Sequence, residues 1–226
     1  MWISEIFESI QGEGLYTGVP SLFVRTSGCN LRCWFCDTPE TSWSPRGEHR
    51  DWEDVLAEVV HSPSPHVVLT GGEPLLQPGV VPLTRALRER GFVVTIETAG
   101  TVDAAVEADL MSISPKLSNS IPADHPGWAS RHDARRDAPE VIRRWLSAHP
   151  YQLKFVVDQP SDVADVEVYL ERFEEIDPSR VWLMPQGTNR DALSQRVGWI
   201  RQAANARGWR VSPRLHIELW GNRRGT

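Results

Sequence analysis

Residues 29–38 of the chain read Cys-Asn-Leu-Arg-Cys-Trp-Phe-Cys-Asp-Thr, and this stretch holds all three cysteines of the 226 residues. The spacing C-x3-C-x2-C brings Cys29, Cys33 and Cys36 together on one tight loop, which is the thiolate density that a metal or cluster site needs. A structural zinc ion takes four closed ligands, and three cysteines alone do not supply them. A [4Fe–4S] cluster held by three cysteines keeps one iron without a protein ligand, and that iron can bind a small molecule.

Two other interpretations of the cysteine loop stay open on the sequence. One is a Cys3His zinc site, in which His49 is the nearest candidate for the fourth ligand. The other is a disulfide, which would leave an odd thiol and is typical of secreted proteins. The chain begins Met-Trp-Ile-Ser-Glu, without the basic and apolar regions of a signal peptide. We therefore expect reduced cysteines and a cytoplasmic location.

The composition is that of an ordinary globular chain, with 40% hydrophobic residues, 24% charged residues and a formal net charge of −6. Its length allows one domain with a full core or at most two small ones, and we expect residues 1–226 to form a single domain. The negative charge argues against broad nucleic-acid binding, which usually needs a basic face. No apolar run is long enough to span a bilayer, so no membrane partner is expected.

Strand and helix patterns alternate about six times along the chain. The sequence predicts strands at residues 2–8, 19–26, 66–70, 92–97, 109–114, 151–157, 181–184 and 209–217. It predicts helices at residues 51–62, 79–90, 102–107, 139–149, 161–172 (capped by Ser161) and 189–207. This alternation predicts an α/β fold, a partial (β/α) barrel of about six parallel strands with outer helices. Residues 117–138 have no periodicity and are predicted to form a loop that acts as a lid.

Glycine-rich and polar loops follow the predicted strands. Ligands in such folds bind beyond the carboxyl ends of the strands. We therefore expect the cysteine loop to meet residues 71–74 (Gly-Gly-Glu-Pro), 98–101, 114–116 and 185–187 at one face.

A second glycine-rich turn contains Gln11, Gly12 and Gly14. It is either a plain hairpin turn or a loop in which the backbone closely approaches a polar ligand. Arg25, near the end of the next predicted strand, could grip a carboxylate through two hydrogen bonds. A surface ion pair is the commoner fate of an arginine, so both interpretations stay open.

The cysteine loop, followed after the next strand by Gly71-Gly72-Glu73-Pro74, resembles the radical S-adenosylmethionine (SAM) superfamily. Further stretches, over nearly the whole chain, resemble the 7-carboxy-7-deazaguanine synthase family; they are residues 5–14, 23–25, 36–38, 97–98, 114–116, 185–187 and 219–222. The most specific of these are the Gln11 loop, the Asp37-Thr38 pair and the Trp-Gly-Asn at 220–222.

The resemblance implies an activity, cofactors and partners. Members of that family convert 6-carboxy-5,6,7,8-tetrahydropterin to 7-carboxy-7-deazaguanine with loss of ammonia, on the route to queuosine and related deazapurines. They are similar to partial barrels, use a [4Fe–4S] cluster, SAM and Mg²⁺, and form homodimers. The resemblance also implies an electron donor such as flavodoxin or ferredoxin.

Roles for individual residues follow from the resemblance. The cluster is implied to be held by Cys29, Cys33 and Cys36, and Mg²⁺ by Thr38, whose plainer role would be to cap the turn. The implied SAM contacts are Phe35, Cys36, Asp37, Gly72, Glu73, Ser114, Pro115, Lys116, Lys154, Phe155, Val156 and Val157. The implied substrate contacts are Ile10, Gln11, Gly12, Arg25 and Thr70. Family chains often finish with a proline close to the substrate, whereas this one ends Arg224-Gly225-Thr226, so the resemblance does not extend to that contact.

Two alternative functions use the same cysteine loop. A radical SAM activase would abstract hydrogen from a glycine of a partner protein, and it would need a peptide-docking groove that no stretch of this sequence marks. A non-enzymatic zinc-binding module would hold zinc without iron, so metal analysis would distinguish it from an iron–sulfur enzyme.

Overall fold

Nine strands form one sheet within residues 1–173 and 176–226, which are the residues described by the computed structural model. The strands are β1 (Trp2–Ile10), β2 (Pro20–Thr26), β3 (Glu48–His49), β4 (His66–Gly71), β5 (Val93–Thr98), β6 (Leu110–Ile113), β7 (Tyr151–Val157), β8 (Val181–Pro185) and β9 (Arg210–Val211). Their order across the sheet is β3-β1-β2-β4-β5-β6-β7-β8-β9. All neighbours from β2 to β9 are parallel, and β1 is antiparallel to both β2 and β3. The open, mostly parallel sheet confirms the predicted partial (β/α) barrel.

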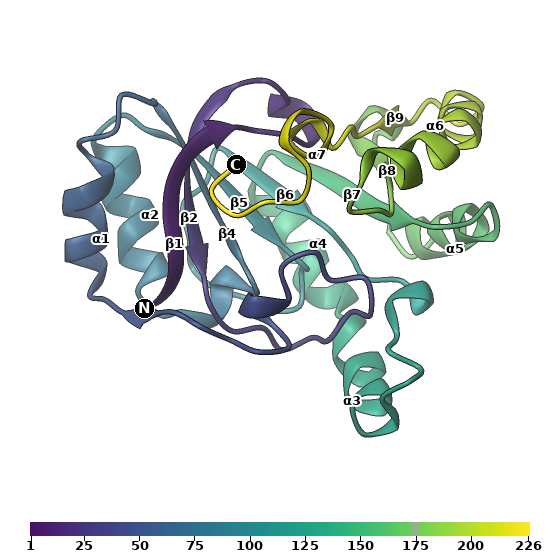
Figure 1. Cartoon of the computed structure of the whole chain (residues 1–226), viewed down its shortest axis with the longest axis horizontal. Helices are drawn as coiled ribbons and strands as arrows, with labels where there is room; N and C mark the ends of the chain where they lie inside the picture. The colour runs from purple at the N-terminus through teal and green to yellow at the C-terminus, as the bar shows by residue number, and fades with distance from the viewer. Residues whose placement is uncertain (174–175) are drawn as a thin grey trace.

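Helices cover the outer side of this sheet. They are α1 (Trp52–Val59), α2 (Val80–Glu89), α4 (Pro139–Ala148), α5 (Ser161–Leu170) and α6 (Arg190–Asn205). Two other helices lie elsewhere: α3 (Pro126–Arg136) contacts the cysteine loop, and α7 (Leu215–Trp220) packs against the Gln11 turn. Figure 1 shows α1 and α2 at one end of the sheet and α5 and α6 at the other. Within the described residues, no helix combines the length and apolar character needed to cross a bilayer.

The hydrophobic core lies between the sheet and these helices. Leu69 of β4 and Ile96 of β5 are fully buried in it. Side chains alternate across a strand, so the next residues, Thr70 and Glu97, face the inner side of the sheet. The outer side is therefore apolar, and the inner side is free to carry polar groups.

The β1–β2 pair is antiparallel because its connection is short. Residues 11–19 join the two strands, whereas a parallel neighbour needs a crossover of about a dozen or more residues. Ile10 pairs with Pro20, so the Gln11 turn leaves the sheet beside the start of β2. By register this turn lies at the amino ends of the parallel strands, yet it reaches the inner cavity described below.

Two predicted elements are wrong. Residues 102–107, predicted as a helix, have no regular structure. There the backbone N–H of Glu107 donates to the hydroxyl of Thr84 on α2 (3.2 Å), so this amide is satisfied by a tertiary contact and not by a helix. The strand predicted at 209–217 stops after β9, because Pro213 cannot donate to a sheet and α7 begins at Leu215.

The start of α5 also differs from the prediction. Ser161 is its first residue and makes no cap. Instead the carboxylate of Asp162 accepts hydrogen bonds from the backbone N–H groups of Asp158 (2.7 Å) and Gln159 (3.2 Å). The short side chain of an aspartate keeps its carboxylate close to the backbone, so it can accept hydrogen bonds from amides of the loop that leads into the helix.

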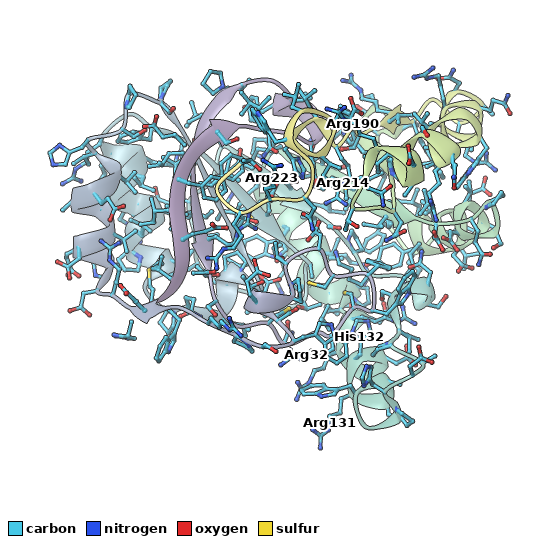
Figure 2. The ribbon with its side chains drawn as sticks, in the orientation of Figure 1. Arg32, Arg131, His132, Arg190, Arg214 and Arg223 are labelled. Carbon is cyan, nitrogen blue, oxygen red and sulfur yellow. The ribbon has the colours of Figure 1, made fainter. Side chains whose placement is uncertain are left out.

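The prediction of an aperiodic loop at 117–138 is wrong as well, since the segment contains a 3-10 turn at Ser118–Ser120 and the helix α3. Only His132 of α3 is buried, so the helix shows no apolar stripe. Nδ1 of His132 accepts a hydrogen bond from the backbone N–H of Arg32 (3.0 Å), and Nε2 of His132 lies 2.8 Å from the hydroxyl of Ser120. Figure 2 shows His132 beside Arg32. α3 is thus anchored to the cysteine loop.

The protonation state of His132 follows from these contacts. The Ser120 hydroxyl donates to the carbonyl of Leu117 (2.6 Å), so it accepts from Nε2–H, and Nδ1 is left as an acceptor. Burial lowers the pKa of His132 to about 4, and the charges of Arg136 and Lys116 act in the same direction. The imidazole is therefore neutral at pH 7.

Candidate active site

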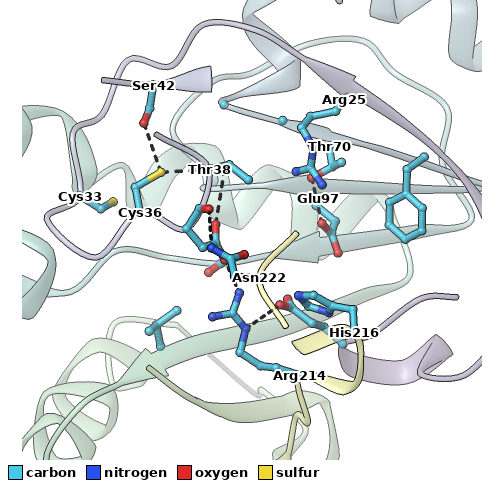
Figure 3. A pocket seen from close by; sticks show the side chains of 18 of the residues that line it. Arg25, Cys33, Cys36, Thr38, Ser42, Thr70, Glu97, Arg214, His216 and Asn222 are labelled. Carbon is cyan, nitrogen blue, oxygen red and sulfur yellow. Dashed lines mark hydrogen bonds and ion pairs between the residues drawn. The ribbon is translucent and has the colours of Figure 1, made fainter. Parts of the chain in front are cut away.

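A cavity of about 590 Å³ opens on the inner side of the sheet. The predicted site residues that line it are Ile10, Gln11, Gly12, Arg25, Cys29, Cys33, Phe35, Cys36, Asp37, Thr38, Thr70, Gly72, Ser114, Lys116, Lys154 and Val156. Figure 3 shows Cys33 and Cys36 on one side of it and Arg25, Thr70 and Glu97 on the other. The cavity therefore has a sulfur end and a polar end.

At the sulfur end, the three cysteines are free thiols that all line the cavity. The Leu31 backbone N–H donates to Sγ of Cys29 (3.3 Å), and the Ser42 hydroxyl lies 3.2 Å from Sγ of Cys36. Burial raises the pKa of Cys29 to about 11 and that of Cys33 to about 12. A thiolate here needs a positive partner, and iron would supply that charge. This donor set fits a cluster.

The zinc interpretation loses its fourth ligand in the structure. His49 is exposed on β3, where its ring packs edge-on against that of Trp2, with 5.6 Å between the centroids. Among the residues described, no group of three or more His, Cys, Asp or Glu side chains could hold a metal ion. A single zinc ion needs all its ligands within about 2.3 Å of one point. A cluster instead spreads its cysteines over separate irons.

The polar end is built around the buried carboxylate of Glu13. Its Oε2 lies 2.5 Å from Nζ of Lys154, and its Oε1 lies 3.1 Å from Nε of Arg214. Burial by itself would raise the pKa of Glu13, but these two cations outweigh it and hold that pKa well below its usual range. Glu13 and Glu97 likewise outweigh burial and raise the pKa of Lys154. Glu13 and Lys154 are therefore charged at neutral pH.

Arg214 joins the polar end to the cysteine loop. Besides Glu13, its guanidinium binds the carboxylate of Asp37 and donates to the carbonyl of Gly187 (2.6 Å). Asp37 directly follows the cysteine Cys36, and Arg214 outweighs the effect of burial to lower the pKa of Asp37. One side chain thus links three loops that are distant in sequence.

Glu97 binds two of the residues that the sequence predicts as substrate contacts. Its two oxygens accept from the hydroxyl of Thr70 (2.9 Å) and the side-chain amide of Gln11 (3.2 Å). Arg25 uses its Nε to bind Glu5 at 2.7 Å, across the β1–β2 pair. Arg25 is therefore an ion-pair partner of Glu5 that also lines the cavity.

Two glycines are required by close contacts at this site. A Cβ on Gly12 would lie 2.0 Å from Nδ1 of His216, and a Cβ on Gly72 would lie 2.2 Å from the carbonyl oxygen of Gly28. The first contact packs the Gln11 turn against α7, and the second packs the end of β4 against the cysteine loop. Both glycines thus allow close packing within the chain, and the approach of their backbone to a ligand stays a prediction.

Ser114 and Lys116 follow β6 and act as a pair. Nζ of Lys116 donates to both the carbonyl and the hydroxyl of Ser114, each at 2.7 Å. Both residues line the cavity. They bring a positive charge to the wall between the cysteines and β6.

Four predicted residues do not line the cavity: Glu73, Pro115, Phe155 and Val157. Lys154 and Val156 face inward on β7, so the alternation of the strand turns Phe155 and Val157 to the core. Glu73 is fully buried, and its carboxylate accepts from the Thr98 hydroxyl and the Ala99 backbone N–H, each at 2.9 Å. Glu73 therefore ties the β4 loop to the β5 loop.

Several cavity residues are missing from the predicted sites. Glu13 and Glu97 lie inside the stretches that carry the family resemblance, so that signal could have pointed to them. Arg214 and His216 lie where a strand is predicted, and only the long-range fold reveals them. The segment after α7 also contributes, since Asn222 lines the cavity and donates to the carbonyl of Asp37 (3.3 Å). Figure 1 shows this C-terminal segment passing in front of the inner strands.

Comparison with known proteins gives consistent matches. Residues 23–117 match the radical SAM superfamily. The chain is 48% identical to a 7-carboxy-7-deazaguanine synthase of Rhodopirellula baltica, over 99% of this chain and 88% of that protein. It is 44% identical to a 7-carboxy-7-deazaguanine synthase of Halobacterium salinarum, over 97% of this chain and 90% of that protein.

A solved structure has a similar fold over almost the same length. The crystal structure of QueE from Escherichia coli matches with a TM-score of 0.72 and 28% identity, over 93% of this chain and 92% of that one. The peptide-bound SuiB of Streptococcus suis matches with a TM-score of 0.57 and 11% identity, which shows a shared fold only.

Proposed function

The chain belongs to the 7-carboxy-7-deazaguanine synthase family of the radical SAM superfamily, and from this premise we propose that it converts 6-carboxy-5,6,7,8-tetrahydropterin to 7-carboxy-7-deazaguanine with release of ammonia. The observation that carries the proposal is the single cavity that joins three cysteines at one end to an array of charged and hydrogen-bonding groups at the other. An activase for a protein glycine and a zinc-binding module are both set aside, because the relatives that cover nearly the whole chain are synthases.

Members of the radical SAM superfamily hold a [4Fe–4S] cluster and SAM, and the residues at the sulfur end suit both. Cys29, Cys33 and Cys36 would hold the cluster. When bound, the cluster and SAM supply a carbon radical that abstracts hydrogen from the substrate. Phe35, Asp37, Gly72, Ser114, Lys116, Lys154 and Val156 are proposed to line the SAM site. Glu73, Pro115, Phe155 and Val157 are proposed to support it through the backbone and the loops that they hold.

The substrate is a small, polar acid, and the polar end of the cavity has the groups to bind it. Arg25 is proposed to pair with the carboxylate, because only its Nε is engaged, by Glu5, and its two terminal nitrogens make no hydrogen bond within the described residues. Gln11 and Thr70 are proposed to recognise the ring, with the backbone of Ile10 and Gly12. Buried polar contacts of this kind reject analogues that lack the matching group.

The proposed reaction predicts a defined product. Enzyme reconstituted anaerobically with iron and sulfide, then supplied with SAM, Mg²⁺, dithionite and 6-carboxytetrahydropterin, should form 7-carboxy-7-deazaguanine, detected by mass spectrometry. Arg25→Ala should raise KM for the pterin about 100-fold, because a hydrogen-bonded charge pair is lost, and should leave KM for SAM near normal. Arg25→Lys should recover only part of the loss, since lysine lacks the planar fork.

The outcome that contradicts the substrate assignment is specific. A preparation that cleaves SAM slowly but forms no deazapurine would leave the superfamily chemistry in place and refute the pterin as substrate. An unchanged KM in Arg25→Ala would return Arg25 to a structural ion pair with Glu5.

We also propose that Thr38 is the protein ligand of Mg²⁺. Within the described residues its hydroxyl has only long contacts, at 3.4 Å to the carboxylate of Asp37, 3.4 Å to the hydroxyl of Thr41 and 3.9 Å to Sγ of Cys36. A hydroxyl with no strong partner is free to meet a cation. Mg²⁺ in proteins keeps several waters and takes few protein ligands, so substrate oxygens would complete the shell.

Removing that hydroxyl gives a test. Thr38→Ala should raise the Mg²⁺ concentration needed for half-maximal activity several-fold, because one oxygen ligand of the octahedral shell is lost. The visible spectrum of the cluster should not change, and Thr38→Ser should behave like the wild type. Equal Mg²⁺ dependence in all three proteins would leave Thr38 with the role of capping the turn.

Further properties are proposed from the family resemblance. We propose that residues 1–226 act as one radical SAM domain in the cytoplasm and form a homodimer. We also propose that a small redox protein, such as flavodoxin or ferredoxin, supplies the electron that reduces the cluster to its active state.

A further inference from the structure

An arginine-rich face lies directly over the cysteine loop. It is made by Arg131 and Arg135 of α3, by Arg32 of the loop and by the ring of Trp128, which contacts Arg32 and Arg131. We include the exposed Trp34, which lies two residues after Arg32 in the loop. The Arg32 guanidinium stacks on the Trp128 ring at 4.3 Å from the ring centroid, and that of Arg131 lies 5.6 Å from the same ring. Figure 2 shows Arg32, His132 and Arg131 gathered along α3, with Arg131 projecting from the molecule.

The face is built onto the loop that carries the cysteines. Arg32 and Trp34 flank Cys33 in sequence, and the Arg32 guanidinium donates to the carbonyl of Cys29 (2.8 Å). The Trp34 indole N–H donates to the carbonyl of Asn119 (2.6 Å), and its ring stays 51% exposed. Because His132 fixes α3 to the same loop, this face and the cysteines form one rigid unit.

A second feature of this face is a hollow beside Trp34. It has a volume of about 430 Å³ and is lined by Trp34, Trp43 and residues 121–125. The Trp43 indole N–H donates to the carbonyl of Cys33 (2.9 Å), and its ring packs on His125 with 4.8 Å between the centroids. The exposed aromatic surface therefore continues around the edge of the cysteine loop.

The charge of this face is opposite to that of the whole chain. Arg32, Arg131 and Arg135 form no ion pair with any residue that the structure describes, whereas the acidic Asp133 is paired with Arg136 at 2.7 Å. Asp124 contributes one acidic side chain to the lining of the hollow. The chain as a whole carries a net charge of −6. Arg32 is half-buried and its guanidinium is held by backbone carbonyls of the loop. Arg131 and Arg135 are exposed and carry positive charge that an external partner can reach.

We propose that this face is the docking surface for an acidic one-electron carrier protein, and the inference rests on the proposed function because it assumes the cluster and its electron donor. Clusters of like charge steer an oppositely charged partner and raise its association rate. The exposed aromatic rings give that partner an apolar contact. One electron leaves the carrier and enters the cluster, so the carrier is oxidised by one unit and the cluster is reduced by one, with no covalent bond formed or broken.

The location favours an electron carrier over other acidic partners. A protein that contacts Arg32 or Trp34 stands next to the loop residues that hold the cluster. Electron-transfer complexes are small and transient, commonly with less than about 1,200 Å² buried, and they rely on charge for speed. A short helix face flanked by aromatic rings suits such a partner.

The test uses flavodoxin as the probe. Its affinity in the oxidised form for the iron-loaded enzyme is measured by titration, and the second-order rate of cluster reduction by its hydroquinone is measured by stopped flow. Arg131→Glu should weaken the affinity and slow the reduction about tenfold at low salt, and the double change with Arg135→Glu should do so further. Both effects should shrink at high ionic strength, where exposed charges are screened.

The matched control is Arg201→Glu on α6. It changes the charge by the same amount, is exposed, and has no ion pair with any described residue. It should leave flavodoxin affinity and reduction rate unchanged. Iron content and product formation driven by dithionite should equal the wild type in all three variants, because dithionite needs no docking face.

Three results would overturn the docking assignment. They are equal effects of Arg131→Glu and Arg201→Glu, no effect of the double change, or a change in sedimentation that makes the face an interface between copies of this chain. If the wild-type enzyme formed no deazapurine with dithionite as the reductant, the proposed function would be refuted. The comparison of flavodoxin affinity among the variants would still test the docking surface.

Discussion

Replacing Arg214 with glutamine is expected to lower the free energy of unfolding by about 3 kcal/mol and to raise KM for both SAM and the pterin. The change leaves Asp37 without its buried cation and removes one of the two cations of Glu13. Breaking a buried ion pair from one side costs roughly 3–5 kcal/mol. Asp37 is 36% exposed, so water relieves part of the loss and the lower value applies.

The two Michaelis constants should rise together because Arg214 holds the loops on both sides of the cavity. It binds Glu13 on the Gln11 turn and Asp37 beside the cysteines, so its loss should loosen the pterin side and the SAM side at once. Urea unfolding followed by tryptophan fluorescence gives the stability, and initial rates give the constants.

Two further variants separate this role from general damage. Arg214→Lys keeps the charge without the fork and should restore part of the stability and of both constants. Arg190→Gln removes an exposed arginine that binds the carbonyls of Glu218 and Leu219, and should cost only about 1 kcal/mol with no effect on either constant. If Arg214→Gln matched Arg190→Gln, Arg214 would have no role in positioning the loops.

The second large effect is expected for Cys33→Ala, which should lose both iron and activity. The wild type should bind about four irons per chain after anaerobic reconstitution, as a thiolate-held [4Fe–4S] cluster requires. Cys33 is buried and lies between the other two cysteines in the loop, so no neighbouring side chain can replace its thiolate. Iron and sulfide analysis, with the charge-transfer absorbance of the cluster, gives the measurement.

Ser42→Ala provides the control. It removes the hydroxyl that lies 3.2 Å from Sγ of Cys36 and keeps all three thiolates. Its iron content should stay at the wild-type value, while the reduction potential of the cluster should shift, because hydrogen bonds to sulfur tune that potential. Full iron content in Cys33→Ala would refute the cluster assignment, and zinc in place of iron would favour the module interpretation.

Local patterns in the sequence predicted much of the fold and part of the site. The alternation of buried strands and amphipathic helices indicated the partial barrel, and the spacing of Cys29, Cys33 and Cys36 indicated the sulfur end. Gly12 and Gly72 indicated places of close backbone approach, but their partners within the chain, His216 and Gly28, could not be read from the local sequence. The strand and helix patterns and the cysteine spacing depend on residues close together in the chain, so they can be recognised in a single sequence.

Helix α3 was missed for a physical reason. An amphipathic helix is recognised by a stripe of apolar side chains, and α3 is held instead by the ring of His132 between Arg32 and Ser120. A single buried polar residue gives no period. Tertiary contacts therefore stabilise this helix. The arginine-rich face over the cysteine loop depends on the same contacts, because it includes residues of α3.

What the sequence by itself determined is the order of the elements, the cysteine loop and the family to which the chain belongs. Only the tertiary structure decided the polar end, where Arg214 meets Glu13 from 201 positions away and Asp37 from 177. It also turned Glu73 from an expected ligand contact into a buried brace between two loops. Charges separated this far in sequence pair only after the sheet has curled, because burial in the finished cavity is what makes each of them need a partner.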